Sequence, residues 1–598
     1  MGVDLDDETR GRILATAEGN PLFLEEMAAL AREARGAVDV PPTVKALLQA
    51  RLDTLDEGER AVIERGAVEG QVFHRGAVTA LAPETLALDV PGRLVALVRK
   101  ELVRPDRSSI AGDDAFRFRH LLIRDTAYEG LPKATRADLH ERFADWLDEH
   151  AELVEQHEIV GYHLEQAVRY RTELDPVDPT AGPLARRAAG RLGEAGRAAL
   201  ERADRFAARS LLRRALALVS EGADRRPLIP DLAEVLIDAR ERVDDLAPLL
   251  DELAAGDARD RALATVLRIR HNPLVGAVDE QLALLDGARA VLEAAGDTVG
   301  LVRCERTRGW VYFWAVRFRE AYLAYRRALE LPRQAGSRVL RREAVVELSI
   351  CAVIGGAADT GEVLRLLDEL ETEVEASGPL LGATLRAATA RSRYLAGDLD
   401  AQAVRAAGVE EARLLEESGG GASAVALARH FDRWVVPWVE GDTVECETGA
   451  RRWVEHTRTV GSGFHAHALG NWAVALCDLG EPERALDAVQ QGRRLADPND
   501  IADQVVLDQA EAWAVALTGA AERARALLER ARERTDGIDA AQPVSDPLYV
   551  EARVLSVLGD VSDARRVLQG LVDRETALGR QRAVDRYRRD LAALDGSP

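Results

Sequence analysis

Lysine is almost missing from this 598-residue chain, and aromatic residues are few. Only Lys45, Lys100 and Lys133 are lysine, so arginine supplies nearly all of the 79 basic residues, and aromatic residues make up 5% of the sequence. An excess of Asp and Glu gives the chain a net charge of −23. That balance argues against a surface that coats nucleic acid, because such binding depends on basic residues that neutralise phosphates.

Cysteine and long apolar runs are also scarce. The four cysteines lie far apart in helical patterns without the paired spacing of metal ligands, so we expect reduced core side chains at Cys304, Cys351, Cys446 and Cys477. No apolar run approaches the ~20 residues that cross a bilayer. The acidic N-terminus is unlike a signal peptide. The sequence therefore predicts a soluble, cytoplasmic protein that does not bind membranes.

Catalytic motifs are missing as well. A phosphate-binding loop ends in a lysine that follows glycine, but Val44, Arg99 and Pro132 precede the three lysines. No serine or cysteine stands in a Gly-x-Ser-x-Gly turn, and the histidine pairs lack the i, i+4 spacing that presents two metal ligands on one helical face. We therefore expect no catalytic residues, no metal and no bound cofactor, in a protein that is not an enzyme.

The sequence does contain many helix-forming residues, and they are arranged in a long repeat. Ala, Leu, Glu and Arg dominate the composition, and Ala512, Gly519, Ala524, Leu528 and Ala531 fit a helix, a tight turn and a second helix. Such self-similarity is typical of a solenoid in which each helical pair buries its apolar face only against its neighbours. We predict an all-α fold in which residues 181–598 form a tetratricopeptide-like, right-handed superhelix of stacked helical pairs. The turns are expected near Gly276, Val316, Gly356, Gly397, Gly441, Gly480, Gly519 and Gly559.

Residues before about 180 do not follow this repeat. Apolar spacing predicts helices up to Glu101, followed by two short strands, Leu102–Pro105 and Phe116–Arg119, with turn-forming residues between them. Helices followed by a hairpin form a winged helix. We therefore place a small winged-helix domain with a β-hairpin at residues 37–120, and connecting helices at 121–180.

Several motifs carry a family resemblance. Residues 17–26 read Ala-Glu-Gly-Asn-Pro-Leu-Phe-Leu-Glu-Glu, and later motifs stand at Phe116–His120, Ile123–Asp125, Ala127–Tyr128 and Leu139–Arg142. Together they resemble the end of the ATPase module and the segment after it in STAND-type signal-transduction ATPases, of the kind linked to bacterial adenylate and guanylate cyclases and to transcription activators. The resemblance implies that residues 1–36 are a remnant of the ATPase lid helices, and that the superhelix is a sensor.

The same resemblance assigns a role to the turn Gly19-Asn20-Pro21. In related switch ATPases a Gly-x-Pro turn lies beside the adenine, which would make Gly19 and Pro21 a vestigial cofactor-binding turn. The alternative is a well-formed helix junction, because glycine suits a helix C-cap, asparagine an N-cap and proline the first helical position. ATP is expected as a cofactor only if an upstream or partner nucleotide-binding domain supplies the missing phosphate loop.

The rare aromatic residues gather mainly in two repeats, at 310–325 and 431–453. In the tetratricopeptide frame Tyr312, Tyr325 and Trp434 take packing positions, whereas eight other residues face the concave groove. Aromatic rings flanked by arginines suit a peptide, a sugar or an aromatic effector, although ordinary packing between repeats would produce the same clustering. The predicted effector groove comprises Arg303, Arg306, Trp310, Phe313, Phe431, Trp438, Gln509 and Trp513.

Three functions follow from these observations. The first is a non-catalytic regulatory scaffold that binds a protein partner or a small effector in the groove. The second is the separated or truncated half of an ATP-binding, cyclase-linked or transcription-activating ATPase. The third is a winged-helix DNA-binding regulator, in which Arg93, Arg99 and Lys100 would form a basic helix face. Neighbouring acidic residues dilute that face, so we do not expect DNA binding.

Overall fold

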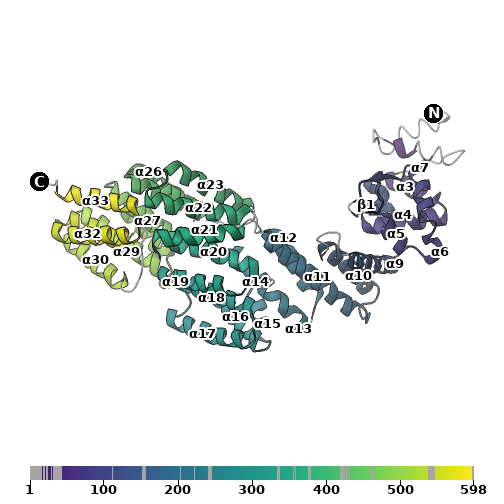
Figure 1. The fold of residues 1–598 in the computed structure, drawn as a ribbon, viewed down its shortest axis with the longest axis horizontal. Coiled ribbons are helices and arrows are strands. Elements are labelled where there is room, and N and C mark those ends of the chain that lie inside the picture. Colours follow the sequence, from purple (N-terminus) through teal and green to yellow (C-terminus); the bar gives the residue numbers. More distant parts are fainter. Residues whose placement is uncertain are drawn as a thin grey trace. The chain divides into compact units, whose positions relative to one another are not determined.

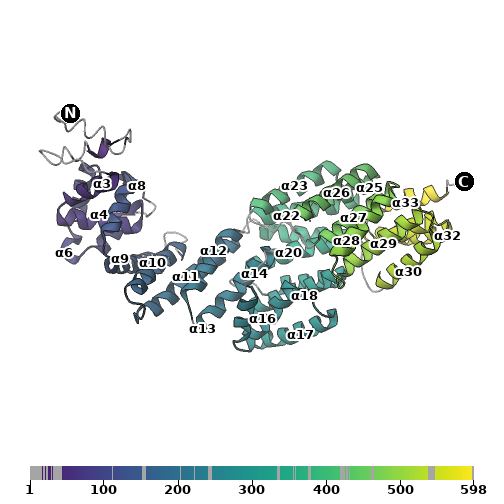
Figure 2. The same ribbon diagram turned by 180° about the vertical axis from the view of Figure 1, so that it is seen from behind.

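The computed structural model describes most of the chain (Figures 1 and 2). Described are residues 17, 21, 24–27, 30 and 43–595, the last range with gaps at 109, 111, 151–156, 203, 221, 240–245, 333–336, 354–355, 357, 375–378, 418–424, 426–427, 430, 460–463 and 536–545. The chain divides into two compact units, Met1–Ala195 with Leu211–Ser220, and Gly196–Ser210 with Glu221–Pro598. Each unit has apolar clusters of its own.

The first unit contains a helical domain with a small antiparallel sheet. Strands β1 (Val72–His74), β2 (Val103–Asp106) and β3 (Ala115–Phe118) lie in the order β1-β3-β2. The predicted hairpin is β2–β3. The prediction missed β1, because three residues are too few for an alternating pattern to stand out. The helices of this domain are α3 (Val44–Asp53), α4 (Glu57–Glu69), α5 (Arg75–Leu81), α6 (Glu84–Ala87) and α7 (Val90–Arg99).

Helix α4 holds the sheet in place. It begins with a capping box, in which the Asp56 side chain accepts from the Glu59 amide at 2.9 Å and the Glu59 carboxylate accepts from the Asp56 amide at 3.1 Å. Further along, a Cβ at Gly66 would lie 2.9 Å from the ring of Phe73, so glycine lets β1 approach the helix. Phe73 in turn packs against Phe118 of β3, with ring centroids 5.1 Å apart.

A buried polar chain joins the next three helices. Tyr128 Oη lies 2.7 Å from His140 Nε2 and 2.9 Å from Tyr170 Oη, and the Nδ1 atoms of His140 and His163 are 2.7 Å apart. Burial, reinforced by nearby positive charge, lowers the pKa of His140 to about 3 and lowers the pKa of His163 well below its ordinary value. Both imidazoles are therefore neutral at neutral pH. The helices are α8 (Leu121–Gly130), α9 (Lys133–Glu149) and α10 (His157–Leu174).

The second unit is a stack of helical pairs (Figure 1). The division between the units falls within α11 and within α12, so each of these helices has residues in both units. After residue 180 the described ranges contain helices and turns but no strand, which confirms the predicted all-helical fold there. In order these helices are α11 (Ala181–Glu201), α12 (Arg205–Leu218), α13 (Gly222–Arg225), η2 (Arg226–Leu228), α14 (Ile229–Ala239), α15 (Leu246–Ala254), α16 (Ala258–His271), α17 (Val278–Ala294), α18 (Thr298–Trp314), α19 (Phe318–Glu330), α20 (Ser337–Val353), α21 (Thr360–Val374), α22 (Pro379–Ala396), α23 (Ala401–Glu417), η3 (Phe431–Val435), α25 (Val436–Glu440), α26 (Thr443–Thr459), α27 (His465–Asp478), α28 (Pro482–Leu495), α29 (Ile501–Leu517), α30 (Ala521–Thr535), α31 (Pro547–Val557), α32 (Val561–Ala577) and α33 (Gln581–Asp595).

The predicted turn positions all have left-handed backbone. The seven glycines among them have φ between 62° and 98°, and Val316 has φ 56°. Glycine adopts this conformation without steric cost, whereas a β-branched residue is strained there. The recurring glycine therefore marks the turn of each repeat because the backbone requires it.

The core of the second unit does not consist of neighbouring pairs alone. Arg580, just before α33, donates to two backbone carbonyls at the end of α20, each at 3.1 Å. The Thr360 hydroxyl donates to the carbonyl of Leu578 at 2.7 Å. Tyr587 belongs to the same apolar cluster as Tyr325. The prediction that each pair packs only against its neighbours is therefore wrong here, because the C-terminal helices pack on elements more than two hundred residues earlier in the sequence.

Candidate functional site

Helix α18 carries a row of partly accessible aromatic rings. Trp310 is three residues from Phe313 and four from Trp314, which places the three side chains on one face of the helix. The rings of Trp310 and Phe313 stack, with centroids 5.5 Å apart and planes 5° apart, and Trp314 meets Trp310 edge-on at 5.6 Å. Aromatic surface that stays accessible in a scaffold rich in Ala and Leu is typical of a contact surface.

The row continues onto two other segments. Phe318, the first residue of α19, meets Phe313 edge-on at 5.5 Å. Phe464, just before α27, stacks on Trp314 with centroids 5.2 Å apart and planes 8° apart. Both phenylalanines are also partly accessible. We call these five residues the aromatic cluster: Trp310, Phe313, Trp314, Phe318 and Phe464.

An ion-pair ladder lies beside the cluster. Arg270 of α16 holds its guanidinium 4.6 Å from the ring centroid of Trp310 and forms an ion pair with Glu347 of α20. Arg306 of α18 pairs with the same carboxylate at 2.9 Å and with Glu234 of α14 at 3.4 Å. These pairs tie α14, α16, α18 and α20 together. The ladder comprises Arg270, Arg303, Arg306, Asp231, Glu234 and Glu347.

A further carboxylate on α20, that of Glu343, is also paired with arginines. Glu343 lies 2.9 Å from Arg205 and 3.4 Å from Arg342. Burial alone would raise the pKa of Glu343, but the charges of Arg205, Arg342 and Arg306 lower it to about 2. The carboxylate is therefore ionised, and it balances arginine charge within the protein.

The structure brings together only part of the predicted groove. Trp310 and Phe313 are adjacent and partly accessible, as expected. Arg303 and Arg306 lie on the same helix, but they are 5% and 1% exposed. Arg303 pairs with Asp231 at 2.6 Å. Their charges are thus used within the ladder, which corrects the expectation that they flank an effector.

The other four predicted groove residues belong to the core, each at most 3% exposed: Phe431, Trp438, Gln509 and Trp513. Trp438 meets Tyr549 of α31 and Tyr587 of α33 edge-on, with ring centroids 5.2 and 5.6 Å apart. The expectation that Trp438 is accessible is therefore wrong. The physical reason is that the C-terminal helices pack over it.

The predicted adenine-proximal turn and basic helix lie in the first unit. Gly19 lies outside the described residues, and Pro21 is exposed. Arg93 of α7 forms an ion pair with Asp56, and Lys100, just after α7, pairs with Glu59 at 2.6 Å. Two of the three basic residues of the helix face considered for DNA binding are thus paired with acidic residues at the start of α4.

Sequence reasoning missed Arg270 and Phe464 as parts of the site. Arg270 is one of many arginines, and Phe464 has no aromatic neighbour close in sequence. Neither residue carries a local signal, because each reaches α18 through tertiary packing.

A metal site, a membrane span and a reactive thiol each place requirements on the described part of the chain. No group of three or more His, Cys, Asp or Glu residues gathers there as metal ligands. No helix among the described residues has the length and apolar character needed to cross a membrane. All four cysteines are buried, as predicted, and burial raises the pKa of Cys304 to about 12.

Comparisons with known proteins give likenesses of low identity. No protein-family model matches the chain, and a search of curated proteins found no match. A solved Rap protein, complexed with competence and sporulation factor, is 14% identical with a TM-score of 0.40, and the match covers 62% of this chain and 98% of that one. A signal transduction ATPase with numerous domains and a tetratricopeptide repeat sensor, from Pyrococcus horikoshii, is 12% identical with a TM-score of 0.38, over 91% of this chain and 72% of that one. Yeast Tom70 is 12% identical with a TM-score of 0.30, over 78% and 96%.

Proposed function

We propose that this chain is a non-catalytic regulatory scaffold that binds a segment of a protein partner through the aromatic cluster. The observation that carries the proposal is the accessible stack of Trp310 and Phe313 on α18. The carboxylates of the ladder already neutralise its arginines, whereas the rings of the aromatic cluster remain partly accessible. Apolar and aromatic side chains of a protein segment match such rings best.

The ladder supports binding by holding the rings in place. Arg270 covers one side of Trp310 while its charge is paired with Glu347, so the ring is fixed before a partner arrives. Trp314 is fixed in the same way by stacking on Phe464. Preorganised rings lose little conformational entropy on binding, which favours affinity.

We also propose that residues 37–120, within the first unit, form a winged-helix domain that relays binding to an output domain, as in the arm of a STAND-type ATPase. The order of elements, α4, β1, α5, α7, β2 and β3, with sheet order β1-β3-β2, supports this assignment. The motifs that resemble that family between Phe116 and Arg142 support it as well. In this arrangement ATP belongs to an upstream or partner domain.

Peptide selection tests the binding proposal. Random peptides displayed on phage would be selected on the full chain, and their affinities measured by fluorescence polarisation. Selected peptides should be rich in aromatic and apolar residues. Phe313→Ser and Trp310→Ala should each weaken them at least about 10-fold, since truncating a hot-spot residue costs about 2 kcal/mol or more and about 1.4 kcal/mol corresponds to 10-fold.

The matched control is Phe206→Ser on α12, which removes a ring that is 60% exposed and stands outside the cluster. This variant should bind the selected peptides as the unmodified chain does. Circular dichroism would confirm that all three variants remain folded. Failure to select any peptide, or equal loss of binding in the Phe206 variant, would overturn the proposal.

A further inference from the structure

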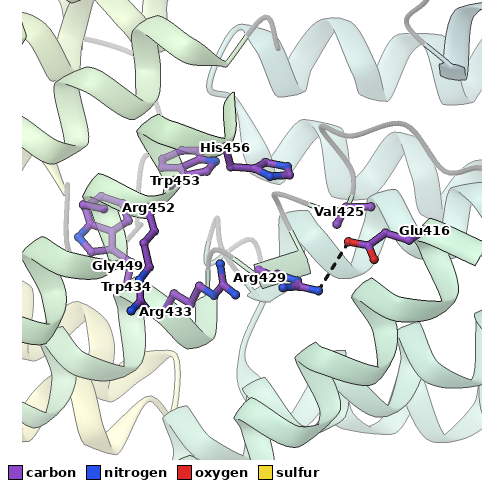
Figure 3. A pocket seen from close by; sticks show the side chains of 10 residues that line it. Glu416, Val425, Arg429, Arg433, Trp434, Gly449, Arg452, Trp453 and His456 are labelled. Atoms are coloured by element: carbon purple, nitrogen blue, oxygen red, sulfur yellow. Dashed lines mark ion pairs between the residues drawn. The ribbon is translucent and has the colours of Figure 1, made fainter. Parts of the chain in front are cut away.

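A cavity of about 80 Å3 lies where α23, η3 and α26 meet (Figure 3). None of its lining residues belongs to the aromatic cluster or the ladder. Figure 3 shows Trp453 and His456 on one side of the opening and Arg429 and Arg433 on the other, with Arg452 and Trp434 closing one end. A cavity that holds one water molecule has a volume of about 10–15 Å3. The volume of this cavity is several times larger, so it has room for a tetrahedral oxyanion.

Positive charge is concentrated in this cavity. Three arginines line it, Arg429, Arg433 and Arg452, and among the described residues of its lining the only acidic one is Glu416. Glu416 lies 3.6 Å from Arg429, and its side chain is 56% exposed. Among the described residues, no carboxylate lies within ion-pair distance of Arg433 or Arg452. The chain as a whole has a net charge of −23, whereas the described lining of this cavity contains three arginines and one acid.

The arginines also act on one another. Burial lowers the pKa of Arg433, and the charges of Arg429 and Arg452 lower it further, while Asp432 opposes them. Asp432 is not part of the lining, because its carboxylate lies beside Gly408 of α23. Positive charges held close to one another are unfavourable, and Glu416 and Asp432 offset them only in part, so an anion in the cavity would relieve the remaining repulsion.

The backbone is shaped to bring these side chains together. A Cβ at Gly449 of α26 would overlap the carbonyl oxygen of Arg433, so only glycine allows α26 to approach η3 this closely. That approach brings Arg452, one turn further along α26, to the same cavity as Arg433. Segment η3 is a single π-helical turn. Such turns are rare and are often found at functional sites.

Two tryptophans give the cavity an apolar wall. The rings of Trp434 and Trp453 lie 6.4 Å apart at an angle of 36°, and Trp434 is 1% exposed. An apolar wall lowers the local dielectric constant, which strengthens the attraction between guanidinium groups and an anion. Arginine also presents N–H groups in a planar fork that matches phosphate oxygens.

We propose that this cavity is a binding site for a doubly charged oxyanion, the phosphate group of a small molecule, held by Arg433, Arg452 and Arg429. The site is independent of partner binding by the aromatic cluster, so either proposal can fail without the other.

Isothermal titration calorimetry of the full chain with inorganic phosphate tests the site, with sodium chloride of equal ionic strength as the reference titration. Phosphate should give saturable binding that chloride does not. Arg433→Gln and Arg452→Gln should each weaken it about 10-fold or more, because hydrogen bonds to a charged group are among the strong ones. Arg452 is exposed, so its replacement leaves the fold intact.

Arg451→Gln is the matched control. Arg451 lies on the same helix, and its removal changes the net charge equally, but its own partners are Glu447 at 3.5 Å and Glu455 at 3.3 Å. This variant should bind phosphate like the unmodified chain. Absence of saturable phosphate binding overturns the proposal, as does equal weakening by Arg451→Gln, which would reveal only a general effect of charge.

Discussion

Gly309→Ala on α18 is the sharpest test of how the repeats pack. A Cβ at this position would lie 2.5 to 2.8 Å from three carbons of the Tyr325 ring. Tyr325 is 1% exposed, so the ring has little room to move. Overpacking of this kind costs about 1–3 kcal/mol, whereas alanine in place of glycine within a helix gains about 1 kcal/mol. We therefore expect a free energy of unfolding that is unchanged or lower by up to about 2 kcal/mol.

Gly287→Ala on α17 separates the cost of overpacking from the gain in helix propensity. Gly287 also lies within a helix, but no atom lies within 4 Å of the Cβ that alanine would add. This variant should be more stable by about 1 kcal/mol, since only the helix gain applies. The difference between the two variants then measures the clash with Tyr325 alone, at about 1–3 kcal/mol.

Urea unfolding followed by circular dichroism measures both variants. A second comparison places Gly309→Ala in a Tyr325→Ala background, where the ring is gone and the substitution should become stabilising. If Gly309→Ala is as stable as Gly287→Ala, the glycine is not needed for the approach of the two helices. The packing reasoning for this repeat would then be refuted.

Three further predictions address other parts of the molecule. Glu101 has φ 56° after the end of α7, so Glu101→Gly should raise the free energy of unfolding by about 1 kcal/mol, whereas Glu101→Ala, which keeps the strain, should not. His140 has a folded pKa of about 3, below its unfolded value, so the unfolded state takes up protons first as the pH falls below about 6.5; urea unfolding at pH 5 should show a loss of about 2 kcal/mol from this residue relative to pH 7.5, and a flat profile would contradict its burial as a neutral group. The full chain should not hydrolyse ATP, because the sequence has no phosphate-binding loop; phosphate release above background would contradict this.

The sequence alone predicted the helical pairs, the hairpin and the register of the turns. Helix and turn formation depend on residues a few positions apart, so the spacing of Gly441, Gly480, Gly519 and Gly559 is enough to place each turn. The left-handed φ at these glycines, and at Val316, confirms that register. The strand that was missed, β1, is three residues long and depends on pairing with a strand more than forty residues later.

The candidate site was predicted only in part, for a related reason. Trp310 and Phe313 could be placed on one face because helical spacing fixes it. Whether a groove position stays accessible depends on segments far away in the sequence: α31 and α33 cover Trp438, whereas Phe464 extends the aromatic cluster. The sequence allowed Arg303 and Arg306 to be assigned to a ligand. The structure instead places carboxylates from other helices beside both of them.

Local patterns thus determined the elements of this protein, and the tertiary structure decided which side chains those elements leave available. The reason is that helices far apart in the sequence pack on one another. Thr360 donates to the carbonyl of Leu578, and Arg580 donates to the carbonyls of Ala352 and Val353. No pattern within a single repeat encodes these contacts. Only the tertiary structure therefore shows which side chains of the stack are covered and which are accessible.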